Sequence, residues 1–221
     1  LKDITIFHDI KNKQIRTLLI LLIVTDLVFV LLHLMLAFRV FYLPEFSLEM
    51  DLGYPEIFQY VKELWIVILF ILIIYKSKNF AYVSWSFLFL FFLLDDSMKL
   101  HENFGYYFAD TFNIQSIIGL RPNDIGEMVF FGIIGMIILL NLILFYRFSC
   151  VSFRNHSKNI FALILLLIFF GLFIDMLHII VNVSYRINQL FGTIEDGGEM
   201  IVMSLILGYV YLLNINNYGS E

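Results

Sequence analysis

Cysteine is nearly absent from this chain. Cys150 is the only one among 221 residues, which excludes a disulfide framework and a thiolate-rich metal cluster. Charged residues are also scarce, at 15%, whereas 61% of the residues are hydrophobic and 18% are aromatic. Ordinary soluble domains of this size do not have such a composition, and apolar runs of about 18 or more residues indicate transmembrane helices.

Six transmembrane spans are predicted from the apolar runs. Since no low-complexity segment, repeat or separate soluble region interrupts them, we expect residues 1–221 to form a single integral membrane domain, an all-α polytopic helical bundle. The first run is too long for a signal-peptide core and lacks a small-x-small cleavage site, so we count it as a span. The second reaches bilayer length only if Lys62 and Glu63 lie inside the helix. The expected spans cover residues 17–38, 60–75, 80–100, 127–146, 160–183 and 197–213.

Lysine and arginine are unevenly distributed about these spans. With the N-terminus inside, nine of them fall on the inner side and five in outer segments or at outer helix ends. Because short cytoplasmic loops carry an excess of Lys and Arg, we expect both termini in the cytoplasm. The expected location is the cell (inner) membrane, as a multi-pass protein.

Carboxylates are almost missing from the inner side. Of nineteen, three fall there and one, Asp26, lies near mid-membrane, whereas the other fifteen lie in outer loops or at outer helix ends. His33, His101 and His178 lie in the outer parts of spans one, three and five. A helix rises about 1.5 Å per residue, so these groups share one layer beneath the outer surface.

The end of the third span, "LLDDSMKLHE", concentrates these groups. On a continuous helix Asp95, Lys99 and Glu102 form one stripe, because their spacing is i, i+4, i+7. Asp96 and His101 diverge by about 140° around such a helix. Both can point at one centre only if the helix is distorted there, or if two neighbouring sites exist.

Some of the outer acids have an ordinary structural explanation. "TIED", residues 193–196, is a capping-box pattern before span six, and Asp124 suits the first turn of span four. For Asp124, Glu195 and Asp196, capping and ligand roles both stay open, whereas Glu127 and Glu199 lie deeper and favour a functional role.

Capping does not explain acids at the C-terminal ends of helices. There the exposed carbonyls repel carboxylates, and a charge buried near lipid costs at least a few kcal/mol unless it is paired or protonated. Outer cations are too few to pair with these acids. We therefore expect a metal ion, bound protons or a transported cation.

Imidazole and carboxylate together indicate which metal is expected. Without thiolate they suit iron, manganese or zinc better than copper(I) or calcium. We expect Glu195 to act as a catalytic base or a further ligand. For His33 a hydrogen bond to a neighbour is the ordinary alternative to a functional role. The groups expected to orient imidazoles or relay protons are Asp26, His33, Glu63 and Asp95. The expected metal ligands are Asp96, His101, Glu102, Glu127, Asp175, His178 and Glu199.

The ligand pattern resembles that of soluble di-iron carboxylate bundles. Those proteins take a Glu from each of two helices and a Glu-x-x-His from each of two others. Here four spans supply carboxylates, Asp175-x-x-His178 imitates one such motif, and His101 supplies a second imidazole. Asp replaces Glu and His101 lacks an i, i+3 partner, so the resemblance supports a ligand count, possible dinuclearity included, rather than an oxidase activity.

Five short motifs together carry a family resemblance: "DLGYPE", "LLDDSMKLHE" (DD-x4-HE), "NDIGEM", "DMLH" and "EDGGEM". The set is similar to one found in uncharacterised prokaryotic multi-pass membrane proteins, and it covers most of the chain from Asp51 to Leu213. That family has no assigned reaction, so the resemblance implies no catalytic residue. Alkaline-ceramidase-like membrane hydrolases are a weaker match, because this chain has six expected spans rather than seven and lacks their late His-x-x-x-His.

These observations predict an integral membrane protein with an outward-facing His/carboxylate metal site. We expect a metal-dependent hydrolase or oxidoreductase that acts on a lipid or a lipid-soluble substrate. The alternatives are a proton- or cation-coupled transporter or channel, and a structural subunit of a membrane complex. Membrane lipid is the expected partner, together with a homo-oligomer or a larger membrane complex, and nucleic acid is not expected.

Overall fold

The fold of the described chain is entirely helical. The computed structural model describes residues 13–117, 120–174, 176–177 and 185–216. Within these ranges there is no β-strand, and six helices are long and apolar enough to cross a membrane. The expectation of an all-α bundle with about six spans is therefore confirmed, and the composition of the helices indicates a multi-pass membrane protein. The six candidate spans are Lys13–Ala37, Tyr54–Ser77, Phe80–Met98, Pro122–Phe148, Val151–Ile174 and Gln189–Asn216.

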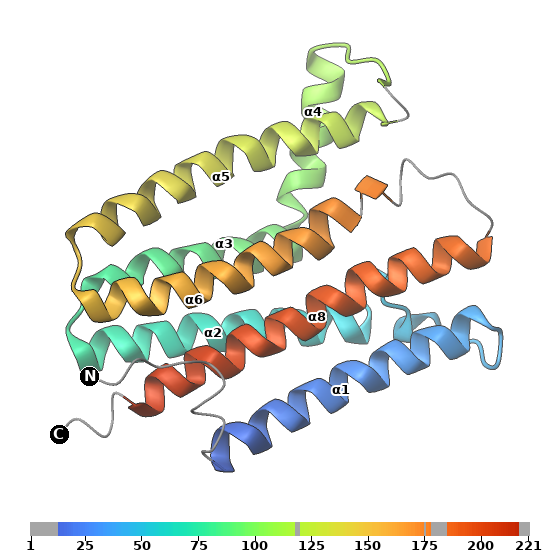
Figure 1. Ribbon diagram of the computed structural model, residues 1–221. Helices are drawn as coiled ribbons and strands as arrows, with labels where there is room; N and C mark the ends of the chain where they lie inside the picture. Colours follow the sequence, from blue (N-terminus) through green and yellow to red (C-terminus); the bar gives the residue numbers. More distant parts are fainter. Residues whose placement is uncertain (1–12, 118–119, 175, 178–184, 217–221) are drawn as a thin grey trace.

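Except for α4, the helices lie along a common direction, and the chain reverses from each one to the next (Figure 1). In chain order they are α1 (Lys13–Ala37), α2 (Tyr54–Ser77), α3 (Val83–Met98), α4 (Leu100–Thr111), α5 (Pro122–Phe148), α6 (Val151–Ile168) and α8 (Tyr185–Asn216). Short 3-10 turns at Pro44–Phe46 (η2) and Phe80–Tyr82 (η3) precede α2 and α3, and a π-helical segment, Phe169–Ile174 (η4), follows α6. The helix α4 does not belong to a span; it crosses the end of α5.

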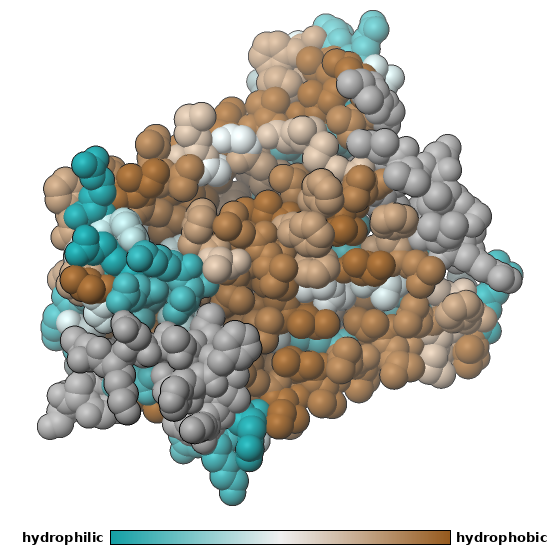
Figure 2. Space-filling model, in the orientation of Figure 1, coloured by the Kyte–Doolittle hydropathy of each residue, from teal (hydrophilic) through white to brown (hydrophobic). Residues whose placement is uncertain are grey.

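The centre of the bundle is α8, which packs against α1, α2 and α6. Two-thirds of its span (67%) is buried, against 11% for α5, so α8 is the core helix and α5 a peripheral one. Met203, Ile206 and Val210 on α8 are at most 1% exposed and pack with Ile66 and Phe70 of α2. The outer faces of the helices carry large exposed apolar side chains, visible as the brown surface across the middle of Figure 2. Such a surface suits contact with acyl chains.

Polar groups inside the bundle are paired with one another. Lys62 and Asp26, both 0% exposed, form an ion pair of 3.1 Å between α2 and α1. The Lys62 ammonium also donates to Met200 O at 2.8 Å and to Ser204 Oγ at 3.4 Å, and Ser204 donates to the other Asp26 oxygen. A charge in the bilayer interior is tolerated when it is paired in this way. Because Lys62 is paired, α2 can run through this charged position from Tyr54 to Ser77, which gives the second span its full bilayer length.

The third predicted span ends differently from expectation. Residues 95–102 do not form a continuous helix, because Lys99 has left-handed backbone angles (φ 52°, ψ 47°) that end α3 and start α4. The Asp95 side chain accepts a hydrogen bond from the backbone N–H of His101 at 2.9 Å. This contact satisfies a free N–H in the first turn of α4, which a carboxylate does well. The expected stripe of Asp95, Lys99 and Glu102 is therefore wrong.

Candidate functional site

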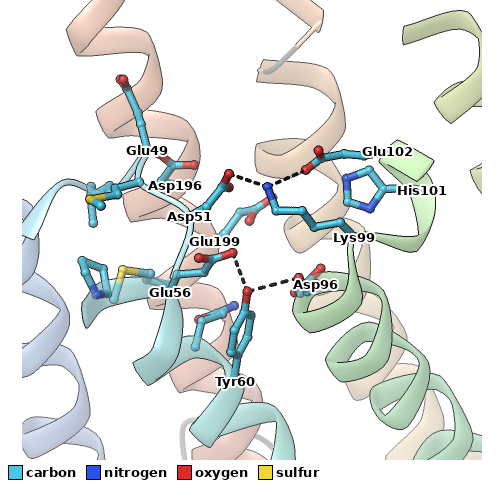
Figure 3. Close-up of a pocket in the computed structure, with 15 residues that line it drawn as sticks. Glu49, Asp51, Glu56, Tyr60, Asp96, Lys99, His101, Glu102, Asp196 and Glu199 are labelled. Atoms are coloured by element: carbon cyan, nitrogen blue, oxygen red, sulfur yellow. Dashed lines mark hydrogen bonds and ion pairs between the residues drawn. The ribbon is translucent and has the colours of Figure 1, made fainter. Parts of the chain in front are cut away.

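One end of the bundle holds a cavity of about 260 Å³, formed by α2, α3, α4, α8 and the loop before α2 (Figure 3). We call it the acidic pocket, because seven carboxylates line it. They are Glu49, Asp51, Glu56, Asp96, Glu102, Asp196 and Glu199. They come from segments far apart in sequence, so the bundle brings together charges that repel one another.

Among the described residues, Lys99 supplies the only ammonium or guanidinium group that lines the acidic pocket. It forms ion pairs with Asp51 and, at 3.4 Å, with Glu102 (Figure 3). The hydrogen bond to Asp51 and the charge of Glu102 raise the pKa of Lys99 against the smaller opposing effect of burial. Lys99 therefore pairs with two of the seven carboxylates, and the described lining carries more acidic than basic groups.

The helix break at Lys99 settles how Asp96 and His101 are arranged. Both line the acidic pocket, Asp96 from the end of α3 and His101 from the first turn of α4. On an unbroken helix they would diverge by about 140°. The break at Lys99 is therefore the helix distortion that allows Asp96 and His101 to line the same pocket.

Asp95 holds His101 in one orientation. Its Oδ2 lies 3.0 Å from His101 Nδ1, and its Oδ1 binds the backbone N–H of the same residue. This pairing places a proton on Nδ1 and leaves Nε2 as the remaining ring nitrogen. Burial lowers the pKa of His101, but the hydrogen bond and charge of Asp95, with Glu127 and Asp96, raise it more, so that the net direction is upward. A carboxylate that orients an imidazole in this way is common behind metal-bound histidines.

Two buried polar groups of α2 lie next to the acidic pocket. Gln59, 9% exposed, lines the pocket, and its Oε1 has no hydrogen bond among the described residues. One turn further, Glu63 is 1% exposed, and its carboxyl group lies within hydrogen-bonding reach of the Asp96 carboxyl, so a proton or a cation must lie between the two. The charges of Asp96 and Glu199 act on Glu63. A buried polar group without a partner costs about 1–3 kcal/mol, and a charged one more, so a cation or a proton is needed here.

Glu199 reaches the acidic pocket across the π-helical segment η4. A Cβ atom on Gly171 would lie 1.7 Å from Glu199 Oε1, so any larger residue there would displace the carboxylate from this position. Single π-helical turns are frequent at functional sites, because the extra residue redirects neighbouring side chains. Here the segment makes space for an acidic side chain of α8.

Tyr60 and Glu56 complete the floor of the acidic pocket. The Tyr60 hydroxyl lies 2.5 Å from Glu56 Oε1 and 3.1 Å from the backbone oxygen of Asp96, and so joins α2 to α3 (Figure 3). Sequence reasoning named neither residue. The i, i+4 spacing of Glu56 and Tyr60 at the start of α2 was the available signal.

Other lining residues were also missed. Glu49 and Asp51 lie in the loop before α2, where their acidic character alone did not separate them from ordinary solvated residues. Asp196 lines the acidic pocket from inside α8, which begins at Tyr185. The capping-box interpretation of residues 193–196 is therefore wrong, and Thr193 donates instead to Gln189 O at 2.6 Å within the helix.

The predicted site residues fall into three groups. Asp96, His101, Glu102 and Glu199 line the acidic pocket. Two of the predicted metal ligands, Asp175 and His178, lie outside the described residues. The predicted residues that do not line the pocket are Asp26, His33, Glu63, Asp95, Glu127 and Glu195.

Some residues of the third group have partners of their own. His33 Nδ1 accepts a hydrogen bond from the backbone N–H of Leu48 at 3.1 Å, which is the ordinary hydrogen-bonded role considered for it. Asp26 pairs with Lys62 instead of with His33. Glu127 lies beside Gly105 of α4, where its charge acts on His101. Asp124 caps α5: it accepts from Arg121 N at 2.9 Å and pairs with the guanidinium, so its capping role is confirmed.

The described side chains do not form a ready metal site. Over residues 13–117, 120–174, 176–177 and 185–216, no three His, Cys, Asp or Glu groups lie where together they could hold a metal ion. The metal-ligand roles therefore stay predictions.

The fold and the acidic pocket define a class: helical multi-span membrane proteins with a strongly acidic cavity at one end of the bundle. The chain belongs to the family Domain of unknown function (DUF8692), whose match covers residues 21–213. This membership agrees with the expected resemblance to a membrane family without an assigned reaction. No curated protein and no solved structure matches the chain.

Proposed function

We propose that this protein binds a divalent metal ion in the acidic pocket and uses it as a membrane enzyme, a hydrolase or an oxidoreductase, on a lipid or lipid-soluble substrate. The observation that carries the proposal is the composition of the described lining: seven carboxylates, of which Asp51 and Glu102 pair with its one lysine. The buried Glu63 carboxyl, which faces that of Asp96 beside the pocket, supports the same conclusion.

Electrostatics makes a cation the natural occupant. Two carboxylates about 6 Å apart repel one another by roughly 3 kcal/mol at an effective dielectric constant of about 20. A divalent ion replaces these repulsions by attractions. Five of the seven acids are held on helices that are packed in the bundle, so these five do not separate freely to relieve the repulsion.

The ligand chemistry favours iron, manganese or zinc. His101 offers Nε2, with Asp95 fixing its ring, and Asp96, Glu102 and Glu199 offer carboxylate oxygens. Asp175 and His178 complete the proposed set. A metal ion in this site would activate water for hydrolysis or support oxidation by oxygen.

We further propose that the acidic pocket faces the extracytoplasmic side of the cell membrane. The opposite end of the bundle carries Lys76, Lys78, Arg147, Arg154 and Lys158, and the described residues at that end include no carboxylate. An excess of Lys and Arg in short connections marks the cytoplasmic side. A pocket at the other end lies at the depth of lipid headgroups, which suits a lipid substrate.

Metal analysis of the purified protein tests the proposal. The protein would be stripped with chelator, reloaded with Mn²⁺, Fe²⁺ or Zn²⁺, and measured by elemental mass spectrometry. We expect Asp96→Asn and His101→Ala to lower metal affinity at least tenfold. Asp110→Asn, an identical change at an exposed acid of α4 outside the pocket, is the matched control. Protein that folds normally but binds no metal in any of these forms would end the proposal.

Proton- or cation-coupled transport is the second candidate, and one observation favours it. Glu63 lies next to Lys62, which pairs with Asp26, so ionisable groups continue from the pocket into the bundle. Below them Ile66, Phe70 and Ile206 are 0% exposed and block the way with apolar packing. Proton or cation flux into liposomes that is lost when Asp26 is replaced would favour transport. A metal-loaded protein that shows no such flux would favour the enzyme.

A further inference from the structure

A second cavity lies far from the acidic pocket, at the basic end of the bundle. It measures about 270 Å³ and is formed by α3, α5 and α6. Because α5 packs mainly on α4 and touches α6 over little of its length, the two helices leave a groove between them. We call it the α5–α6 groove.

The walls of the α5–α6 groove are apolar. Leu139, Ile143 and Phe161 each expose between 41% and 46% of their surface, and Trp85 forms the inner wall with its indole N–H bound to Ser157 Oγ at 2.9 Å. Water gains no hydrogen bonds from such walls. In a bilayer an acyl chain fills an apolar groove between spans, because it restores the packing that the helices lack.

The mouth of the α5–α6 groove is positively charged. Lys158 lines it and has no ion-pair partner among the described residues. The sequence from residue 128 to residue 174 contains no Asp or Glu, but it contains Arg147, Arg154 and Lys158. The segment from residue 128 to residue 174 therefore carries three positive charges and no carboxylate.

The depth of Lys158 matches that of a lipid headgroup. The first nine residues of α6, from Val151 to Asn159, are largely polar, and a continuous apolar run begins at Ile160. Lys158 therefore lies at the boundary between polar and apolar surface, where a lysine extends its ammonium toward the headgroups. Tyr146 lines the same mouth, and tyrosine is typical of this depth.

We propose that the α5–α6 groove is a binding site for an anionic phospholipid, with an acyl chain against Trp85 and Phe161 and the phosphate at Lys158. The charge selects the headgroup: one lysine near a membrane surface favours an anionic lipid by about fivefold over a zwitterionic one. This site is independent of the metal proposed for the acidic pocket.

Bromolipid quenching of tryptophan fluorescence tests the proposal directly, because Trp85 lines the groove. Trp65, the other tryptophan, lies on α2 outside the groove and would be replaced (Trp65→Phe). The full chain would be reconstituted in phosphatidylcholine vesicles with increasing fractions of dibrominated phosphatidylglycerol or dibrominated phosphatidylcholine. We expect Trp85 to be quenched by both lipids, with about fivefold stronger apparent binding of the anionic one.

Two variants identify the groove as the source of that preference. Lys158→Gln should abolish it, whereas Arg147→Gln, the same loss of charge at an α5 residue that does not line the groove, should preserve it. Ile143→Phe narrows the groove without changing charge, so quenching by both lipids should fall. Equal quenching by the two lipids, or no quenching at all, would overturn the proposal. So would a preference for the anionic lipid that survives Lys158→Gln, or one that Arg147→Gln abolishes equally.

Discussion

Replacing Lys62 by methionine should destabilise the protein far more than replacing Lys62 and Asp26 together. Lys62 is 0% exposed, and its ammonium binds Asp26 Oδ1 at 3.1 Å, Met200 O at 2.8 Å and Ser204 Oγ at 3.4 Å. Lys62→Met leaves Asp26 as an unpaired charge in a dry interior. Removing one partner of a buried ion pair costs about 3–5 kcal/mol, whereas replacing both by apolar side chains is often nearly neutral.

The assay is thermal unfolding in detergent, read from intrinsic fluorescence. A change of about 3–5 kcal/mol corresponds to a fall of roughly 10 °C in the unfolding midpoint for a chain of this size. The double variant Asp26→Leu/Lys62→Met should recover most of that loss, because no buried charge remains. Additive losses in the double variant would refute the reasoning, since they would show that the two side chains act independently.

Two further predictions concern the acidic pocket. Because the pKa of His101 is raised in the folded protein, its stabilising contribution is full below about pH 6.5 and is lost as the pH rises through the folded pKa. The difference in thermal unfolding midpoint between chelator-treated wild type and His101→Gln should therefore shrink at alkaline pH. A difference that grows with pH would contradict this. Gly171→Ala should push Glu199 out of place and weaken metal binding at least tenfold. Gly132→Ala, which has no atom within 4 Å of the new Cβ, should leave metal binding unchanged. Equal metal affinities of the two variants in a metal titration would argue against the role of the π-helical segment.

The site was predictable in outline but not in membership. Asp96, His101, Glu102 and Glu199 were recognised because acids at the C-terminal ends of helices and deep in spans lack an ordinary explanation. Glu127 met the same criterion, and for Glu195 capping and a functional role both stayed open, yet neither lines the pocket. Depth along a helix is readable from sequence, but the direction in which a side chain points depends on the packing of that helix.

The break at Lys99 shows why local sequence was insufficient. Lysine rarely adopts positive φ, and nothing in residues 95–102 marks a helix end as a glycine would. The break is stabilised by Asp95, whose carboxylate binds the N–H and the ring of His101. That contact exists only once the second helix has turned, so no local pattern announces it.

The amino-acid sequence by itself determined the six apolar spans and the segregation of acids from bases along them, because lipid admits only continuous apolar helices and each short connection keeps its own charges. Tertiary structure alone decided which of those acids meet. The loop acids Glu49 and Asp51 face the helix-borne Asp96 and Glu199, and Lys62 finds Asp26 across 36 positions of sequence. Those contacts depend on the rotation of each helix about its axis, which is set by how the buried apolar faces fit together.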